Sequence, residues 1–333
     1  MEKLWKYKKI GEVCIVERGA SPRPIDKYIT DNESGINWIK IGDTSDSMYI
    51  TETAQKIIIE GMKKSRYVKP GDFLLSNSMS FGRPYILKID GCIHDGWLVL
   101  RDENALFDKR FLYYYLSSKT TYKKLKSMAV GGVVNNLNSE MVRNVIVPVP
   151  DKEEQSEIAD LFDKIKKILD DRKQELEQLD TLVKSRFVEL FGDPVINSRG
   201  WKKALIGDDC FVTKLAGFEY TQYINYEDSG DVVMVKAQNV KNGKLNRKEL
   251  SFISNEVSDS LPRSQLAPGD VVMTYVGANI GDVAIIDNEY KYHLAPNVAK
   301  IRPDSERYNS IYFMYMLMLL NAYIVKNSAD TAK

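Results

Sequence analysis

The residues that most often carry catalysis in proteins are scarce in this chain. It has two histidines, His94 in CIHDGW and His293 in KYHLAPN, and imidazole is the side chain most often used as a general acid or base. The chain has no GxGxxG, GxSxG or HExxH motif, and no GxxxxGK followed by Ser or Thr. Its many carboxylates form no recognisable constellation. We therefore interpret both histidines as packing or hydrogen-bonding residues near strand ends.

Cysteine content and charge also narrow the function. Cys14, Cys92 and Cys210 are an odd number without a CxxC pair, so neither a disulfide framework nor a zinc site is indicated, and we expect buried thiols. The net charge is +1, which gives no general attraction to nucleic acid or to an anionic membrane. A polyanionic partner would have to be held by local patches or with help from another protein.

The longest apolar stretch, IYFMYMLMLLNAYIV at residues 311–325, is interrupted by Asn321 and is short for a membrane span. We expect a buried helix there. The N-terminal MEKLWKYKKIGEVC has no apolar run behind its basic residues, so it does not resemble a secretory signal. The sequence thus predicts a cytoplasmic protein.

Several segments of the sequence occur twice in similar form. VKPGDFLLSNSMSFGRPYILK at residues 68–88 returns as LAPGDVVMTYVGANIGDVAII at residues 266–286, WKYKKIGEVC resembles WKKALIGDDC, and NWIKIGDTSD resembles VMVKAQNVKN. A repeat of roughly two hundred residues is far longer than the units of solenoid proteins. With 333 residues, 44% of them hydrophobic, the chain should form two similar mixed α/β domains, each rich in strands and followed by an aromatic helix.

The Pro-Gly-Asp tripeptide in each copy has a local structural explanation. Proline presets φ at the second position of a turn, and glycine adopts the positive φ that a type II turn requires next. The apolar run that follows is then a strand leaving the turn. We therefore assign Asp72 and Asp270 a structural role rather than a chemical one.

A long amphipathic segment lies between the two copies. Asp151 with Glu154 three residues later is typical of a helix start, and Gly192 before Asp193-Pro194 is typical of a helix end. A helix of about 40 residues would be roughly 60 Å long, too long to be buried against one small domain. We expect a spacer whose apolar stripe meets another helix. The candidate interface residues of this stripe are Ile158, Leu161, Ile165, Ile168, Leu176, Leu179, Val183 and Phe187.

The order of these parts carries a family resemblance. A module, a helix entered through PVPDKEEQSEIADLFDKI and left through LVKSRFVELFGDP, and a second module beginning with Trp-Lys together resemble the specificity subunit of type I restriction-modification enzymes. The resemblance covers the whole chain and implies a non-catalytic, sequence-specific DNA-binding subunit. Residues 1–150 and 193–333 would be target-recognition domains, each reading one half of a bipartite site, and the helix at residues 151–192 would set the spacer.

The same resemblance implies the partners. Methyltransferase subunits would dock on this chain, and restriction subunits with an ATP-driven motor would join them on double-stranded DNA. S-adenosylmethionine, ATP and magnesium would be bound by those partner subunits. We therefore expect no cofactor and no metal in this chain.

Given the resemblance, the residues that read DNA should lie in loops beside the strands, because Arg, Asn, Gln and Ser there can reach base edges in a groove. The alternative for each residue is that its polar group satisfies a turn or a strand end, and both interpretations stay open. The candidates are Arg23, Asn77, Ser78, Ser80 and Arg83 in the first copy, and Lys236, Gln238, Asn239, Lys241, Tyr275 and Asn279 in the second.

The second copy departs from the family pattern. At an offset of 201, Lys333 corresponds to Gly132, so no counterpart of residues 133–192 follows the second module. In the family a second helix runs antiparallel to the central one. We therefore expect the stripe to pack against a partner subunit or a second copy of this chain. The alternative function is a truncated scaffold that binds methyltransferase subunits but reads DNA poorly.

Overall fold

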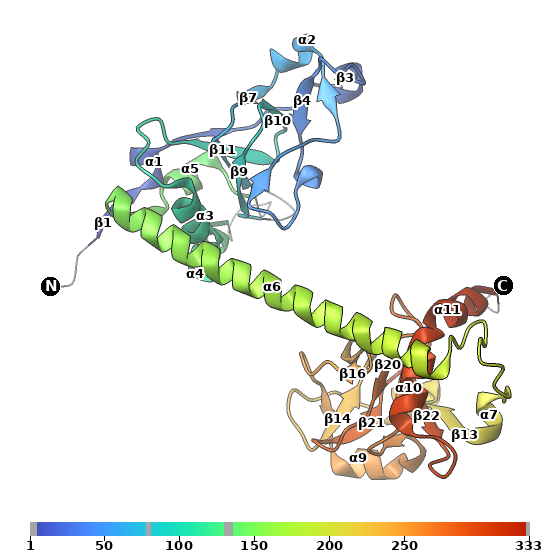
Figure 1. Ribbon diagram of the computed structural model, residues 1–333. Coiled ribbons are helices and arrows are strands. Elements are labelled where there is room, and N and C mark those ends of the chain that lie inside the picture. Colours follow the sequence, from blue (N-terminus) through green and yellow to red (C-terminus); the bar gives the residue numbers. More distant parts are fainter. Residues whose placement is uncertain (1–4, 78–80, 130–135, 331–333) are drawn as a thin grey trace. The chain divides into compact units, whose positions relative to one another are not determined.

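The computed structural model describes residues 5–77, 81–129 and 136–330 (Figure 1). The chain divides into two compact units, Met1–Arg172 and Lys173–Lys333, which we call unit 1 and unit 2. Among the described residues each unit has two β-sheets of four or five strands, and one long helix, α6 (Lys152–Phe191), contributes to both units. The predicted mixed α/β class with a long amphipathic helix is confirmed.

The larger sheets of unit 1 have the strand orders β2-β11-β8-β9-β5 and β3-β6-β4-β10-β7. β5 runs parallel to β9 and β4 parallel to β10, and a separate antiparallel pair joins β1 to β12 just before α6. The strands are β1 (Lys6–Lys9), β2 (Ile15–Arg18), β3 (Ile29–Thr30), β4 (Ile36–Ile39), β5 (Tyr49–Ile50), β6 (Lys56–Ile57), β7 (Arg66–Val68), β8 (Phe73–Ser76), β9 (Pro84–Leu87), β10 (Gly91–Ile93), β11 (Trp97–Arg101) and β12 (Ile146–Val149). The helices before α6 are α1 (Ile10–Val13), η1 (Ile25–Lys27), η2 (Ile41–Asp43), α2 (Ile59–Met62), α3 (Lys109–Ser117), α4 (Lys119–Ala129) and α5 (Ser139–Arg143).

The larger sheets of unit 2 have the strand orders β13-β22-β19-β20 and β17-β14-β21-β18. β14 runs parallel to β21, and a short hairpin joins β15 to β16. The strands are β13 (Cys210–Lys214), β14 (Val232–Val235), β15 (Val240–Lys241), β16 (Lys244–Leu245), β17 (Phe252–Ile253), β18 (Gln265–Leu266), β19 (Val271–Thr274), β20 (Val283–Ile285), β21 (Lys291–Leu294) and β22 (Val298–Pro303). The helices are α7 (Ile206–Asp209), α8 (Gly217–Tyr223), η3 (Ala237–Asn239), α9 (Asn255–Ser260), η4 (Pro262–Ser264), α10 (Ser310–Leu319) and α11 (Asn321–Asp330).

The two units repeat one topology, as the doubled sequence indicated. The order β6-β4-β10-β7 in unit 1 corresponds to β17-β14-β21-β18 in unit 2, and β2-β11-β8-β9 corresponds to β13-β22-β19-β20. Their registers agree: Val68 lies opposite Gly91, and Leu266 lies opposite Tyr292. Each core is formed mainly by the apolar faces of these sheets, where four-residue strands such as β8 and β14 are buried along their whole length because both of their faces are covered.

Both Pro-Gly-Asp tripeptides form the expected turn. Gly71 and Gly269 have φ values of +90° and +88°, and the N–H groups of Asp72 and Asp270 each donate to the carbonyl three residues earlier at 3.0 Å. The aspartate side chains serve the fold. The carboxylate of Asp270, for example, forms a two-point ion pair of 2.5 and 2.7 Å with Arg302 on β22.

Helix α6 begins and ends close to where the sequence predicts. The side chain of Asp151 accepts a hydrogen bond from Glu154 N–H at 2.9 Å, and Gly192, with φ +86°, donates its N–H to Val188 O at 2.8 Å. The helix has 40 residues, which corresponds to a length of about 60 Å. Every residue from 167 to 183 is exposed, so the middle of the helix lies outside both cores.

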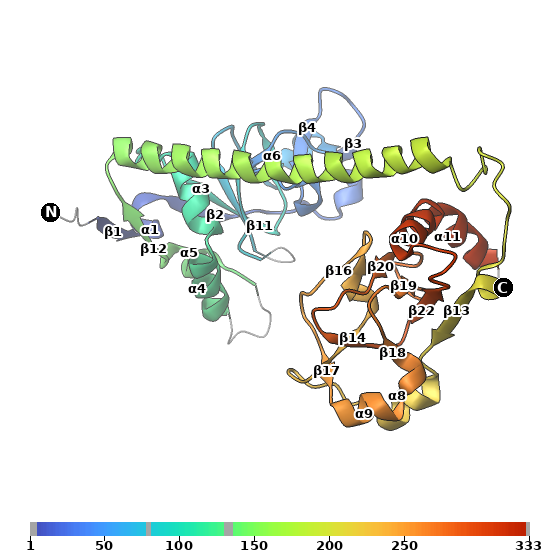
Figure 2. The same cartoon turned by 60° about the horizontal axis from the view of Figure 1, so that its bottom comes forward.

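The apolar stretch near the C-terminus forms two helices instead of one. α10 buries Phe313, Met314 and Leu317, and Leu320 separates it from α11, which lies beside it in Figure 2. Burial is partial, because Ile311 is 56% exposed. No described helix is long and apolar enough to cross a membrane.

The three cysteines are free thiols, and two of them are buried as the sequence predicts. Cys14 and Cys92 are buried and Cys210 is half-buried. Burial raises the pKa of Cys14 to about 12 and that of Cys92 to about 11, because a buried thiolate loses its hydration. Burial also raises the pKa of Cys210.

Candidate nucleic-acid interface

An open cleft of about 630 Å³ lies in unit 1 between the loop after β2 and the turn after β4. Arg23, Trp38, Lys40, His94 and Asp95 are among its lining residues. The cleft forms because β2 and β10 end at neighbouring points: Ala20 N–H donates to Ile93 O at 3.2 Å. Two loops that are about seventy positions apart in the sequence are thereby brought together.

The cleft is lined by two cationic side chains, Arg23 and Lys40, and by two anionic side chains, Asp26 and Asp95. Arg23 is 83% exposed at its side chain and lies 3.4 Å from the Asp95 carboxylate. The hydroxyl of Ser21 donates to Asp95 at 2.8 Å and lowers the pKa of that carboxyl, so Asp95 is ionised at neutral pH. Burial lowers the pKa of His94, so its imidazole is neutral there and supplies no positive charge.

Of the other unit 1 candidates, Asn77 lies beside the cleft and Arg83 lies on a neighbouring surface. Asn77 is buried, and its amide donates to Asp95 O at 2.8 Å, which supports the loop rather than exposing a free amide. Arg83 lies 3.3 Å from the Asp46 carboxylate, with its guanidinium over the Tyr85 ring. Ser78 and Ser80 lie outside the described residues.

In unit 2 four of the candidates lie at the turn after β14. Asn239 is buried: its side-chain oxygen accepts from Lys236 N–H at 3.1 Å, and its amide donates to Asn246 O at 2.9 Å. Gln238 is exposed, with its amide 3.4 Å from a backbone carbonyl, and Lys241 on β15 is also exposed. Asn239 therefore shapes the turn, while the other three side chains keep groups available for a partner.

Tyr275 and Asn279 lie in a different loop of unit 2, between β19 and β20. The ammonium of Lys214 lies 5.1 Å from the centre of the Tyr275 ring. Asn279 is exposed, and its carbonyl accepts from Asp282 N–H at 3.1 Å. The half-buried Tyr275 ring therefore pairs with Lys214, and the exposed Asn279 lies four positions further along the same loop.

Sequence reasoning missed Lys40, which lines the unit 1 cleft. A signal for it was present, because the similarity of NWIKIGD to VMVKAQN places Lys40 opposite the candidate Lys236. The described residues contain no group of His, Cys, Asp and Glu side chains arranged to hold a metal. His293 is fully buried in β21. The site can donate hydrogen bonds and positive charge, and nothing in its geometry indicates bond-breaking chemistry.

Polar contacts attach α6 to unit 1. Gln155 is fully buried, and its amide group donates to Leu106 O at 3.0 Å and Pro150 O at 2.9 Å, while its oxygen accepts from Asp108 N–H at 2.8 Å. One side chain thus satisfies three backbone groups of unit 1. Because hydrogen bonds depend on direction, this contact fixes the orientation of the helix start.

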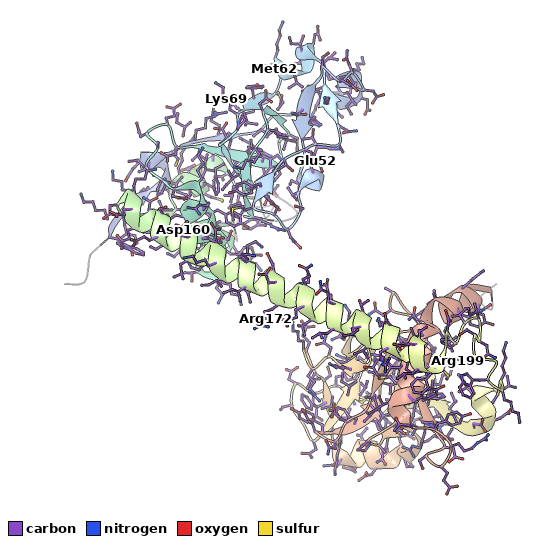
Figure 3. The ribbon with its side chains drawn as sticks, in the orientation of Figure 1. Glu52, Met62, Lys69, Asp160, Arg172 and Arg199 are labelled. Atoms are coloured by element: carbon purple, nitrogen blue, oxygen red, sulfur yellow. The ribbon has the colours of Figure 1, made fainter. Side chains whose placement is uncertain are left out.

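A charged cluster adds to this attachment one turn further along α6. The guanidinium of Arg110 on α3 lies 2.7 Å from Asp160 and 2.6 Å from Asp163, and Figure 3 labels Asp160 where α6 passes unit 1. Tyr114 donates its hydroxyl to Asp163 at 2.5 Å and stacks on Phe162. The carboxylates raise the pKa of Arg110, so it stays charged.

Aromatic rings attach α6 to unit 2. Phe187 is buried and stacks on Tyr312 of α10, with ring centres 5.2 Å apart, and Phe191 meets the same tyrosine edge-on at 4.9 Å. After the helix, Arg199 donates to Glu189 O at 2.8 Å, close to the end of α6 as Figure 3 shows.

The candidate interface residues of α6 accordingly fall into two groups. Ile158 packs against the core of unit 1, and Phe187 packs against α10. The remaining six are exposed and form what we call the exposed stripe: Leu161, Ile165, Ile168, Leu176, Leu179 and Val183.

Three comparisons place the chain among known proteins. The sequence model of the type I restriction modification DNA specificity domain matches residues 2–179. The specificity subunit of the type I restriction enzyme MjaVIII from Methanocaldococcus jannaschii is 24% identical over 328 residues, covering 94% of this chain and 74% of that protein. The EcoBI specificity subunit of Escherichia coli is 23% identical over 259 residues, covering 68% of this chain and 52% of that protein.

The fold has a counterpart among solved structures. A chain studied for complex assembly and conformational transition of the type I R-M system superimposes with a TM-score of 0.51 at 17% identity, covering 97% of this chain and 81% of that one. The likeness concerns the fold alone. It is the domain match, over more than half of the sequence, that identifies the chain: it belongs to the family of type I restriction-modification DNA specificity proteins, whose role is the recognition of DNA sequence and not catalysis.

Proposed function

We propose that unit 1 and unit 2 each read one half of a bipartite DNA site and that α6 sets the length of the unread spacer. The observation that carries this proposal is the repetition of one sheet topology on either side of a single unbroken helix of 40 residues. Two copies of one fold suit two half-sites, because each copy can present equivalent loops to its own segment of duplex.

The dimensions support a ruler role. One turn of B-DNA extends about 34 Å along its axis, and α6 is about 60 Å long. Its start is held by the buried Gln155 and by the cluster around Arg110. A helix attached by directional contacts transmits changes in its own length to the groups that it carries.

The partners follow from the exposed stripe and the charge. Specificity subunits of type I systems bind DNA and assemble with methyltransferase and restriction subunits. We propose that the exposed stripe of α6 is covered in that assembly by a methyltransferase subunit or by a second copy of the chain, because so much exposed apolar surface on one helix is typical of an interaction site. The net charge of +1 suits a reader whose partners contribute much of the phosphate contact. A cytoplasmic location belongs to the same proposal.

A domain exchange tests the division of labour. In the chain assembled with its methyltransferase subunits, residues 1–150 are replaced by the corresponding module of another specificity subunit, and the methylated sites are then determined in a random DNA library. We expect one half-site to change while the other half-site and the spacer stay the same. Simultaneous change of both half-sites would contradict the proposal. Footprinting of the unaltered complex should show two separated protected patches, and no protection at all would favour a scaffold role instead.

A further inference from the structure

Two lysines occupy the same place in the two units. Lys40 is the residue after β4, and Lys236 is the residue after β14, and each of these strands pairs in parallel with the matching strand of its own sheet, β10 or β21. The backbone registers agree around them, since Trp38 N–H donates to Gln55 O and Met234 N–H donates to Ser251 O, both at 2.9 Å.

The side chains of the two lysines are also held alike. The ammonium of Lys40 donates to the Gln55 side-chain oxygen at 2.7 Å, and the ammonium of Lys236 donates to the Ser251 hydroxyl at 2.8 Å. In both units the partner residue directly precedes the strand that pairs antiparallel with β4 or β14, namely β6 or β17. The partner is glutamine in unit 1 and serine in unit 2, but the ammonium group contacts the same position of the fold in both.

Neither ammonium is neutralised by its partner. Both lysines are half-buried, both partners are uncharged, and within the described part of the chain neither lysine forms an ion pair within 4.0 Å. Asp43 lies near Lys40, but its two oxygens accept from the backbone N–H groups of Lys40 at 2.7 Å and Ala54 at 3.1 Å. In unit 2 the corresponding residue is the neutral Asn239.

Each ammonium group has three N–H donors and uses one of them in these contacts. A half-buried cation with a neutral partner gains most from an anion that completes its hydrogen bonds. Arg23 lines the same cleft as Lys40, where Asp95 is 3.4 Å from Arg23 and Asp26 also lines the wall, and the Tyr226 ring lies 5.5 Å from the ammonium of Lys236. Both positions are therefore suited to an anionic group that approaches from outside.

We propose that Lys40 and Lys236 each contact a phosphate of the DNA backbone, one in each half-site. This inference rests on the proposed function, in which each unit reads one half-site. Contacts to bases must differ between two unlike half-sites, whereas the phosphate backbone presents the same groups at both. A lysine repeated at one structural position therefore suits the phosphate backbone of DNA, which is the same at both half-sites. The residues that follow the lysines, Ile41-Gly42 and Ala237-Gln238, differ between the two units, as residues that read different bases should.

The test uses the full chain assembled with its methyltransferase subunits and a duplex carrying the site that the unaltered complex methylates. The variants are Lys40→Gln, Lys236→Gln and both together, and the dissociation constant is measured between 50 and 200 mM salt. We expect each single change to weaken binding roughly threefold to tenfold, and to lower the slope of log affinity against log salt by about 0.9, the value for one phosphate contact. The double change should lower the slope by about twice that amount. The Lys→Arg variants should restore it.

Matched controls come from two lysines that also have neutral partners but no lysine at the corresponding position of the other unit. Lys64 donates to the Tyr28 hydroxyl at 2.6 Å, and Lys291 donates to the Asn255 side chain at 2.9 Å. By the strand registers, the residue of unit 2 that corresponds to Lys64 is Pro262, and the residue of unit 1 that corresponds to Lys291 is Asp90. Lys64→Gln and Lys291→Gln should leave the slope unchanged. Circular dichroism melts of all variants show whether any change in binding comes from loss of fold.

Two outcomes would overturn the inference while leaving the proposed function intact. An unchanged salt slope in the folded Lys→Gln variants would show that the lysines only support the turns. A loss of affinity confined to particular bases in a sequence library would show base contacts in place of phosphate contacts. Failure of the unaltered complex to protect two half-sites would instead contradict the proposed function itself.

Discussion

The two ends of α6 are attached to their units by different kinds of contact. At the start, Gln155 forms buried hydrogen bonds and Arg110 forms ion pairs, and both kinds of contact are directional. At the end, Phe187 and Phe191 pack against the rings of α10. Ring packing tolerates small rotations at little cost in energy, whereas a buried hydrogen-bond set does not. The difference indicates that buried polar contacts fix the start of α6, whereas ring packing dominates at its end, where Arg199 and Trp201 add hydrogen bonds to backbone carbonyls of the helix.

The largest expected effect is at the aromatic end. Phe187→Ala removes a buried ring that contacts Tyr312 and Phe191, and we expect unit 2 to lose about 3 kcal/mol of stability. Hydrogen exchange of the full chain, followed separately in each unit, measures this loss and should show unit 1 unchanged. The matched control is Phe218→Ala, because Phe218 is 68% exposed and its loss should change stability by less than about 0.5 kcal/mol. Equal destabilisation by both changes would refute the apolar attachment.

A somewhat smaller effect is expected at the polar end. Gln155→Ala leaves three backbone groups of unit 1 without their partner, and we expect a loss of about 2 to 3 kcal/mol in unit 1. Exchange protection of the α3 amides, measured in the full chain, reports it. Gln174→Ala on the exposed middle of the same helix is the control and should cost little. If the methylating complex still folds, Gln155→Ala should also broaden the range of accepted spacer lengths, which loss of stability alone does not predict.

The smallest expected effect concerns the charged cluster. Arg110→Met removes a partly exposed guanidinium between Asp160 and Asp163, and we expect about 1 kcal/mol of destabilisation at low salt. Because salt screens exposed charges, the difference from the unaltered chain should shrink when unfolding is repeated at 1 M salt. Arg186→Met, which removes an exposed pair with Glu189 on the same helix, provides the baseline. A salt-independent loss at Arg110 would assign its role to packing.

Much of this arrangement was predictable from local sequence signals. The limits of α6 follow from Asp151 and Gly192, and the turns at Gly71 and Gly269 follow from Pro-Gly-Asp, because capping and turn formation depend on a few adjacent residues. The doubling of the topology followed from the repeated phrase. Such signals are independent of what the rest of the chain does.

The candidate site was predicted less well, for reasons that lie in long-range packing. Asn77 and Asn239 were expected as possible base readers, yet both amides are buried and bound to backbone carbonyls. Their burial is decided by loops that meet only after the sheets form. Lys40 contacts Gln55 fifteen positions away, just as the candidate Lys236 contacts Ser251, so the repeat between the two copies was the signal for it. The break between the two C-terminal helices at Leu320 likewise has no Gly or Pro that would predict it from the sequence.

The state of the three cysteines has a practical consequence for experiments on this chain. At neutral pH the raised pKa values of the buried Cys14 and Cys92 leave almost no thiolate, and thiolate is the form that reacts with maleimide dyes. Fluorophores could therefore be attached at new surface cysteines without first removing Cys14 or Cys92, once the half-buried Cys210 has been replaced. Pairs of dyes placed in the two units would then report, by energy transfer, whether the span between them changes when DNA is added.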